Sequence, residues 1–155
     1  MTRTPLRTGL VALILCVAAS AWAAPGSFEG LAVSTASGKR ELRVEVMRTD
    51  ADRARGMMFR TEMPAGTGML FEMPREGVAT FWMKDTPLPL DMVFIRRDGT
   101  VDSVAADAVP LSTAVVPSRG PVTGVLEIPG GEAARLGIAP GDRVSHPFFD
   151  RGAPR

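Results

Sequence analysis

The chain has 155 residues, a length that corresponds to a single domain. Its 18 Lys and Arg residues nearly balance its 17 Asp and Glu residues, which excludes a protein that binds nucleic acid through a strongly basic surface. Hydrophobic residues make up 45% of the chain, which excludes a disordered protein, and the single cysteine excludes a disulfide scaffold and a zinc-finger cluster.

Residues 1–23 have the pattern of a secretory signal peptide. Arg3 and Arg7 precede an almost wholly apolar run over residues 10–19, and a site with small residues at the two positions that a signal peptidase recognises ends at Ala23. The alternative is an uncleaved membrane anchor, although the apolar run is shorter than the roughly 20 residues that cross a bilayer. The sequence therefore predicts a periplasmic or secreted protein that is not stably inserted in a membrane after signal cleavage.

Cleavage after residue 23 would change the composition of the mature chain. It would remove Arg3 and Arg7, so that the formal net charge of +1 becomes −1. It would also remove Cys16 and leave a thiol-free chain, which suits an oxidising compartment. We predict that residues 24–150 form a single mainly β domain and that residues 151–155 form a frayed tail.

Short segments in which apolar and polar residues alternate, or in which apolar residues run together, predict strands along most of the mature chain. The predicted strands cover residues 31–33, 42–46, 68–71, 78–83, 90–95, 100–105, 122–128 and 143–149. Asp98-Gly99 lies between two of them and indicates a hairpin with a type I′ turn.

Two short helices complete the predicted elements. The first begins at Thr49, where Asp52 three residues later would complete a capping box, and ends at Gly56. The second covers residues 132–136 and stops at Gly137. Close turns and the lack of long helical crossovers favour a mainly β fold, a small antiparallel barrel-like sheet of seven or eight short strands with two short helices.

Several motifs of the mature chain together resemble one protein family. They are Arg55-Gly56-Met57-Met58 with Arg60, Gly68-Met69-Leu70-Phe71, Phe81-Trp82-Met83-Lys84-Asp85-Thr86, Leu88-Pro89-Leu90-Asp91 with Phe94, Glu127 with Gly130, and Gly141-Asp142. This set resembles the domain of unknown function 192 family of secreted or membrane-associated bacterial and archaeal proteins. The resemblance implies a compact, mainly β fold and a periplasmic or extracellular setting, and it implies no activity.

The chain departs from the family pattern at two positions. Met57 stands where the family usually has Leu, and Asp85 stands where it usually has Asn. The acid at position 85 argues against a role that needs an amide donor there.

Asp91 is an acid within the otherwise apolar run Leu90–Ile95. A buried carboxylate costs several kcal/mol unless it is paired or hydrogen-bonded, so we expect a partner, with Lys84, Arg60 or Arg55 as the candidates. The functional interpretation is a polar pocket that receives a ligand group. The structural interpretation, which we favour, is an ion pair or a carboxylate that caps backbone N–H groups near the turn at residues 87–89.

Trp82 and Lys84 are two residues apart on a predicted strand and therefore share a face. An exposed Trp beside a cation is a common pair for stacking on a ligand, although a core Trp is the more usual outcome in so small a barrel. If Phe81 and Met83 face the core, then Thr86 joins Trp82 and Lys84 on the opposite face, which becomes the predicted site.

Glu127 lies between two apolar residues, before Gly130 and Gly131. Its carboxylate either lines the same pocket or accepts hydrogen bonds from the N-terminal N–H groups of the following helix. Asp91 and Glu127 together would provide a general acid and base, which leads to an alternative function as a carbohydrate-active hydrolase or lyase.

Methionine is abundant in the mature chain, and thioether sulfur binds Cu(I), so a periplasmic copper carrier is a second alternative. The eight residues are Met47, Met57, Met58, Met63, Met69, Met73, Met83 and Met92. Their places on predicted strands and the short helix favour core packing instead. His146 is the only histidine, and a lone histidine is seldom a metal site, so we predict no bound metal and no cofactor.

The common catalytic motifs are missing from the sequence. There is no Gly-x-Ser-x-Gly elbow, no phosphate-binding loop and no dinucleotide fingerprint. The leading hypothesis is therefore an exported binding or accessory module rather than an enzyme. Its ligand would be a small polar molecule or a cell-envelope component, and the predicted ligand-binding residues are Arg60, Trp82, Lys84, Asp91 and Glu127.

Overall fold

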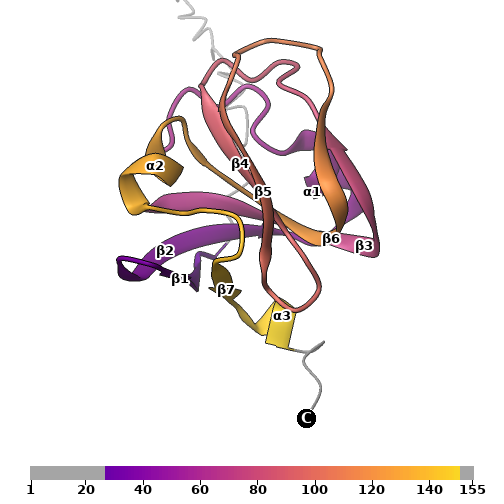
Figure 1. The fold of residues 1–155 in the computed structure, drawn as a ribbon. Coiled ribbons are helices and arrows are strands. Elements are labelled where there is room, and N and C mark those ends of the chain that lie inside the picture. Colours follow the sequence, from indigo (N-terminus) through magenta and orange to yellow (C-terminus); the bar gives the residue numbers. More distant parts are fainter. Residues whose placement is uncertain (1–26, 151–155) are drawn as a thin grey trace, which may run out of the picture.

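Seven strands form one curled, half-barrel sheet in the computed structural model, with three short helices at its margins (Figure 1). The strands are β1 (Glu29–Thr35), β2 (Gly38–Met47), β3 (Thr67–Phe81), β4 (Leu90–Ile95), β5 (Val101–Ala108), β6 (Val116–Pro129) and β7 (Arg143–Ser145). The helices are α1 (Asp50–Arg55), α2 (Glu132–Leu136) and α3 (Pro147–Asp150).

The structure describes residues 27–150, so the predicted signal peptide (1–23) and frayed tail (151–155) lie outside the described residues. Over the described part, no helix combines the length and the apolar character that a membrane crossing requires.

The mainly β prediction is confirmed, and the differences from it concern individual elements. The two strands predicted at residues 68–71 and 78–83 are one long strand, β3, which shifts register against β6 between Glu72 and Gly77 and again just before Thr80. The last predicted strand is shorter than expected, because Pro147–Asp150 form α3 instead. Proline suits this position, since its fixed φ and missing N–H are tolerated in the first turn of a helix.

The strand order is β5-β4-β6-β3-β2-β1-β7, and one pair of neighbours, β2 and β3, is parallel. The expectation of a fully antiparallel sheet is corrected here. Parallel neighbours need a crossover of a dozen or more residues, and the segment 48–66, which contains α1, supplies it. The crossover was hidden in the sequence because its helix has only six residues.

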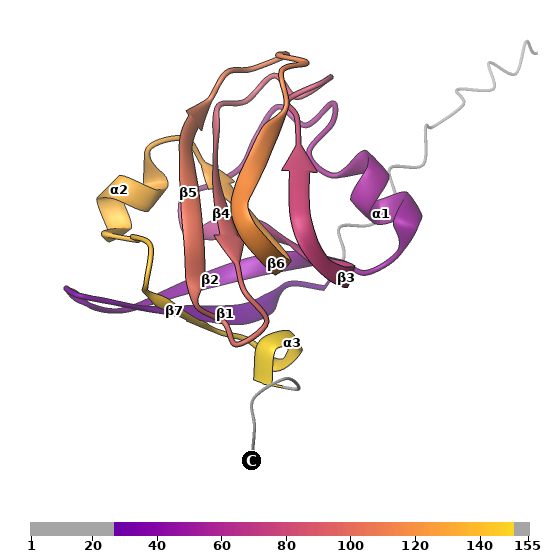
Figure 2. The ribbon, with the colours of Figure 1, turned by 45° about the vertical axis from the view of Figure 1, so that its right-hand side comes forward.

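Helix α1 begins with the predicted capping box. The backbone N–H of Asp52 donates to the Thr49 hydroxyl oxygen over 3.1 Å, and the backbone N–H of Thr49 donates to the Asp52 carboxylate over 3.2 Å. Gly56 ends the helix with a positive φ of 43°. Figure 2 shows α1 beside β3, with α2 on the opposite side of the molecule. The short helix therefore ends where the chain turns back towards the sheet.

Both faces of the sheet are buried along β4 and along the adjoining parts of β3 (residues 68–71) and β6 (residues 122–128), and all six residues of β4 are buried. Alternate side chains enter two separate core clusters. On β4, Val93 and Ile95 belong to the first cluster, whereas Met92 and Phe94 belong to the second. The first cluster also receives side chains from β1, β2, β7 and α2, and the second receives Met57 and Met83 from the connecting segments.

The hairpin between β4 and β5 meets β7 and joins the two outer edges of the sheet. Thr100 forms an isolated antiparallel bridge with Arg143, and the backbone N–H of Val144 donates to the Gly99 carbonyl over 2.8 Å. The hairpin is confirmed, but the type I′ turn is not, because Gly99 has a positive φ (86°) and Asp98 does not. A Cβ atom at position 99 would collide with the carbonyl oxygen of Val144.

Gly99→Ala is therefore expected to lower the free energy of unfolding by about 2 kcal/mol or more, since it adds both backbone strain and a clash with β7. The matched control is Gly77→Ala on β3, where an added Cβ atom has no neighbour within 4 Å. Urea denaturation of both variants measures the difference. Equal stability of the two variants would show that the contact between the hairpin and β7 does not constrain the fold.

Candidate functional site

A cavity of about 450 Å³ opens between α1, β3 and the segment that follows β3. Three of the five predicted ligand-binding residues, Trp82, Lys84 and Glu127, line it. Apolar side chains form much of the remaining wall, among them Met58 and Phe81. This combination of an apolar wall with a few polar groups is typical of small-molecule sites, which usually enclose roughly 300–1,000 Å³.

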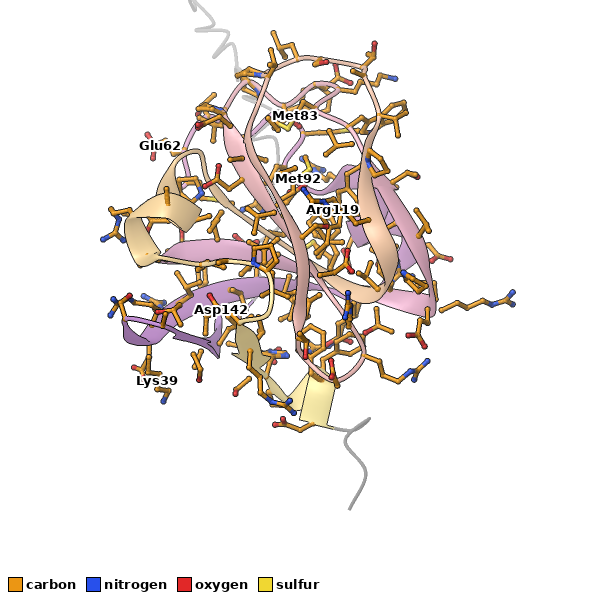
Figure 3. The ribbon with its side chains drawn as sticks, in the orientation of Figure 1. Lys39, Glu62, Met83, Met92, Arg119 and Asp142 are labelled. Carbon is orange, nitrogen blue, oxygen red and sulfur yellow. The ribbon has the colours of Figure 1, made fainter. Side chains whose placement is uncertain are left out.

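Glu127 is the buried acid of this cavity, with 4% of its surface exposed. It lies on β6 directly between Met69 of β3 and Met92 of β4, and both of these side chains are fully buried. Figure 3 places Met92 in the interior of the molecule, with Met83 nearer the loops at one end. The Glu127 Oε2 atom has no hydrogen-bond partner among the residues that the structure describes.

Burial raises the pKa of Glu127 to about 8, because the charged form loses its hydration and gains no partner. The carboxyl group is therefore mostly protonated at neutral pH. In that state it offers one O–H donor and retains acceptor capacity, so it can form hydrogen bonds with a neutral polar group.

Trp82 is exposed (48%), so the expectation that it lies in the core is wrong. The Nζ atom of Lys84 lies 5.5 Å from the centre of its ring. Met83, between these two residues, is buried, as the predicted alternation requires. The alternation ends at Thr86, which is buried although it still lines the cavity. Trp82 and Lys84 therefore stand together at the exposed side of the cavity.

Arg60 is not among the residues that line the cavity. Its two terminal nitrogens donate to the two carboxylate oxygens of Glu45 over 2.5 and 2.7 Å, and the Glu45 side chain is nearly buried. Such bidentate pairs are strong and geometrically specific. Arg60 thus neutralises a buried acid of β2, a role that the sequence analysis did not consider.

Asp91 is fully buried and lies outside the cavity. Its carboxylate accepts hydrogen bonds from the backbone N–H groups of Asp107 (2.8 Å), Gly131 (3.1 Å) and Ala133 (2.8 Å). Backbone donors therefore satisfy Asp91 where a cationic partner was predicted, and two of these donors, Gly131 and Ala133, lie at the start of α2. The expected capping of backbone N–H groups does occur, and it stabilises the start of α2 rather than the turn at residues 87–89.

Asp91 and Glu127 lie on opposite faces of the sheet. In the register between β4 and β6, Asp91 is opposite Ile128, whereas Glu127 is opposite Met92. Side chains of directly opposite residues share a face, and successive residues alternate between faces. The structure therefore does not bring the two carboxyl groups together as a general acid and base.

Two further features of the cavity were not assigned from the sequence. Arg55, at the end of α1, lines the cavity mouth, whereas the sequence analysis considered it only as a partner for Asp91. Asp85 adopts a positive φ of 54°, and its carbonyl oxygen accepts from the backbone N–H of Phe59 over 2.7 Å. Asn and Asp both tolerate this backbone conformation, which explains how either residue fits at position 85.

The methionines are concentrated in and against the second core cluster, and Met57, Met58 and Met73 also line the cavity. Seven of the eight belong to the second core cluster or pack against it, and Met58 lines the cavity. Across residues 27–150, no three His, Cys, Asp or Glu side chains are grouped so that they could hold a metal ion. His146 is buried, and its Nδ1 atom accepts from the backbone N–H of Phe148 over 3.3 Å.

Residues 32–146 match the sequence model of domain of unknown function 192 (DUF192), which is described as an uncharacterised conserved group. The chain belongs to the DUF192 family. The match includes every residue that lines the cavity, so the cavity is formed entirely by the family domain.

Two solved structures are similar to this DUF192 protein. One is a candidate transcription regulator from Sinorhizobium meliloti 1021, with 41% identity over 79% of this chain and 95% of that chain and a TM-score of 0.75. The other is a protein of unknown function from Novosphingobium aromaticivorans DSM 12444, with 45% identity over 77% of this chain and 85% of that chain and a TM-score of 0.75. No protein with a curated description matches the chain.

Asp91→Ala is expected to lower the free energy of unfolding by about 3–5 kcal/mol, because it leaves three backbone donors of a buried region without an acceptor. Glu62→Ala, at an exposed acid (Figure 3), serves as the control and should change stability by less than about 0.5 kcal/mol. Chemical denaturation checks both values. A loss for Asp91→Ala no larger than that for the control would contradict the structural role.

Glu127→Gln is expected to remove a pH dependence of stability. Between pH 4.5 and about 8 the unfolded chain ionises Glu127 while the folded protein keeps it protonated, so the stability of the wild type falls as pH rises, by at most about 1.4 kcal/mol per unit. The Gln amide cannot ionise. The free energy of unfolding of Glu127→Gln minus that of the wild type should therefore grow over this pH range and then level off. Denaturation at pH 5, 6.5 and 8 measures it, with Glu62→Gln as control. A difference that is constant with pH would contradict a protonated Glu127.

Proposed function

We propose that this DUF192 protein is an exported binding or accessory module that holds a small polar molecule, or a small part of a cell-envelope component, in the cavity beside α1. The observation that supports it is that Glu127, whose buried Oε2 atom has no hydrogen-bond partner among the described residues, is one of the residues that line the cavity. A buried polar atom without a hydrogen bond costs roughly 1–3 kcal/mol. A ligand that forms a hydrogen bond with this carboxyl group would remove that cost, and the free energy recovered would contribute to binding.

The composition of the wall supports a small-molecule ligand. Met57 and Met58 come from the crossover, and Phe71 and Phe81 from β3, so apolar side chains from two separate segments line the cavity together with Glu127. Methionine side chains adapt their shape readily and are common at adaptable binding surfaces. The wall therefore suits an organic molecule with both apolar and polar parts.

The two alternative functions have weaker support. The hydrolase or lyase needs Asp91 and Glu127 on one side of a substrate, and their placement on opposite faces does not provide this. The copper carrier needs methionine sulfur atoms that a metal can reach. Met57, Met58 and Met73 line the cavity, whereas Met69 and Met92 are fully buried in the core, so only part of the methionine set is open to a metal. We therefore propose an organic ligand, and copper becomes an outcome of the test.

Export is part of the proposal and is supported by the signal-peptide pattern of residues 1–23. The module would then meet its ligand in the periplasm or outside the cell. No nucleic acid partner is proposed, since the chain carries almost equal numbers of acidic and basic residues.

The proposal is tested by titrating a library of small polar organic fragments into the purified 15N-labelled protein. We expect saturable shifts of the Trp82 indole N–H and the Gly56 amide, since both residues line the cavity, with no shift at Gly137 after α2, which lines neither this cavity nor the second one beside β1. The hits should bind at least about tenfold more weakly to Glu127→Leu, which removes the hydrogen-bonding carboxyl group.

The proposal would be overturned if no fragment in the library shifted both the Trp82 indole signal and the Gly56 amide signal. Cu(I) is titrated in parallel. A rise in melting temperature with Cu(I), together with no fragment binding, would favour the copper carrier instead.

A further inference from the structure

Building on the proposed function, we infer that the cavity takes a small flat carboxylate. Its anionic group meets Lys84 and Arg55 at the mouth, and a neutral hydrogen-bonding group at its far end meets Glu127. The inference names the chemical class of the ligand for the site described above.

The charges that line the cavity favour an anion. Asp50 and Arg53 form an ion pair with each other, and a guanidinium nitrogen of Arg53 also donates to the backbone carbonyl of Glu72 over 2.9 Å. Neither Arg55 nor Lys84 forms an ion pair with any residue in the part of the chain that the structure describes. The mouth therefore carries two positive charges that no acid of the wall balances.

The buried end of the cavity is suited to a neutral group. Glu127 is mostly protonated at neutral pH, since no cation or donor in the described part of the chain compensates its burial. A cationic group would bind favourably only if Glu127 ionised, and Lys84 and Arg55 would repel it at the mouth. A hydroxyl or amide group binds without ionisation of Glu127, because the protonated carboxyl group can donate to it and accept from it.

The aromatic part of the wall suits a flat, apolar body. The Trp82 ring is half exposed beside Lys84 at the exposed side of the cavity, and Phe81 packs edge-on against the buried Phe71, with ring centres 5.0 Å apart. An exposed aromatic ring such as that of Trp82 binds flat rings by stacking. The lining of the cavity thus fits a ligand that combines an anionic group, a ring and a neutral polar group.

Three probes of matched shape test this order of groups: 4-hydroxyphenylacetate, 4-hydroxyphenylacetamide and tyramine. They share the ring and the hydroxyl group and are anionic, neutral and cationic at pH 7. We expect calorimetric or NMR titration to show the carboxylate binding at least about tenfold more tightly than the amide, with tyramine weakest. Equal affinities, or tyramine as the tightest probe, would overturn the inference.

Substitutions at the mouth of the cavity test whether Lys84 and Arg55 cause the preference for the carboxylate over the amide. Lys84→Met and Arg55→Met should each reduce the preference for the carboxylate over the amide by about tenfold, because each removes one charge while keeping a long side chain. The control is Lys39→Met on β2, an exposed lysine outside the cavity, which should leave the preference unchanged. If both variants still preferred the carboxylate over the amide as strongly as the wild type does, the inference would also be overturned.

The two proposals fail in distinguishable ways. If fragments from the library bind at Trp82 and Gly56 but the three probes do not, or bind without regard to charge, then the ligand class is wrong and the binding function stands. If no compound of any kind binds there, both proposals fail.

Discussion

The burial of both faces of the sheet along β4 and the neighbouring part of β6 governs the rest of the structure. Asp91 and Glu127 lie in this region and must be satisfied without water, and the chain does this in two opposite ways. Asp91 receives three backbone N–H groups and thereby fixes the start of α2. Glu127 has no partner among residues 27–150 and becomes neutral instead. The first solution stabilises the fold, and the second leaves hydrogen-bonding capacity at a cavity.

The cavity results from the parallel pairing of β2 and β3. That pairing requires the crossover that contains α1, and the crossover supplies one wall together with Arg55 and Met58. The opposite wall follows β3, where the left-handed backbone of Asp85 holds the segment against Phe59. Non-glycine residues in this conformation are uncommon and often occur at functional sites, where the surrounding structure enforces them. The parallel pairing of β2 and β3, which shapes the sheet, therefore also positions Trp82 and Lys84.

The local patterns of the sequence predicted most strands, the capping box of α1 and the hairpin at Gly99, because these depend on neighbouring residues. The need of Asp91 for a partner was also predictable, since a buried charge must be satisfied. Its donors were not, because Gly131 and Ala133 lie about forty residues away and meet it only through the pairing of β4 with β6. That register likewise separates Asp91 from Glu127, and no local pattern reveals it.

The pairing of β7 with β1 imposes an order on the assembly of the molecule. The last strand of the chain completes the edge of the first, so Val33 cannot meet Val144 until nearly all of the polypeptide is present. Contacts between segments so distant in sequence form slowly, and an uncovered strand edge recruits other chains in the meantime. A chain that lacks β7 would thus leave the edge of β1 uncovered, so the closing pair of strands also protects the sheet from association with other chains.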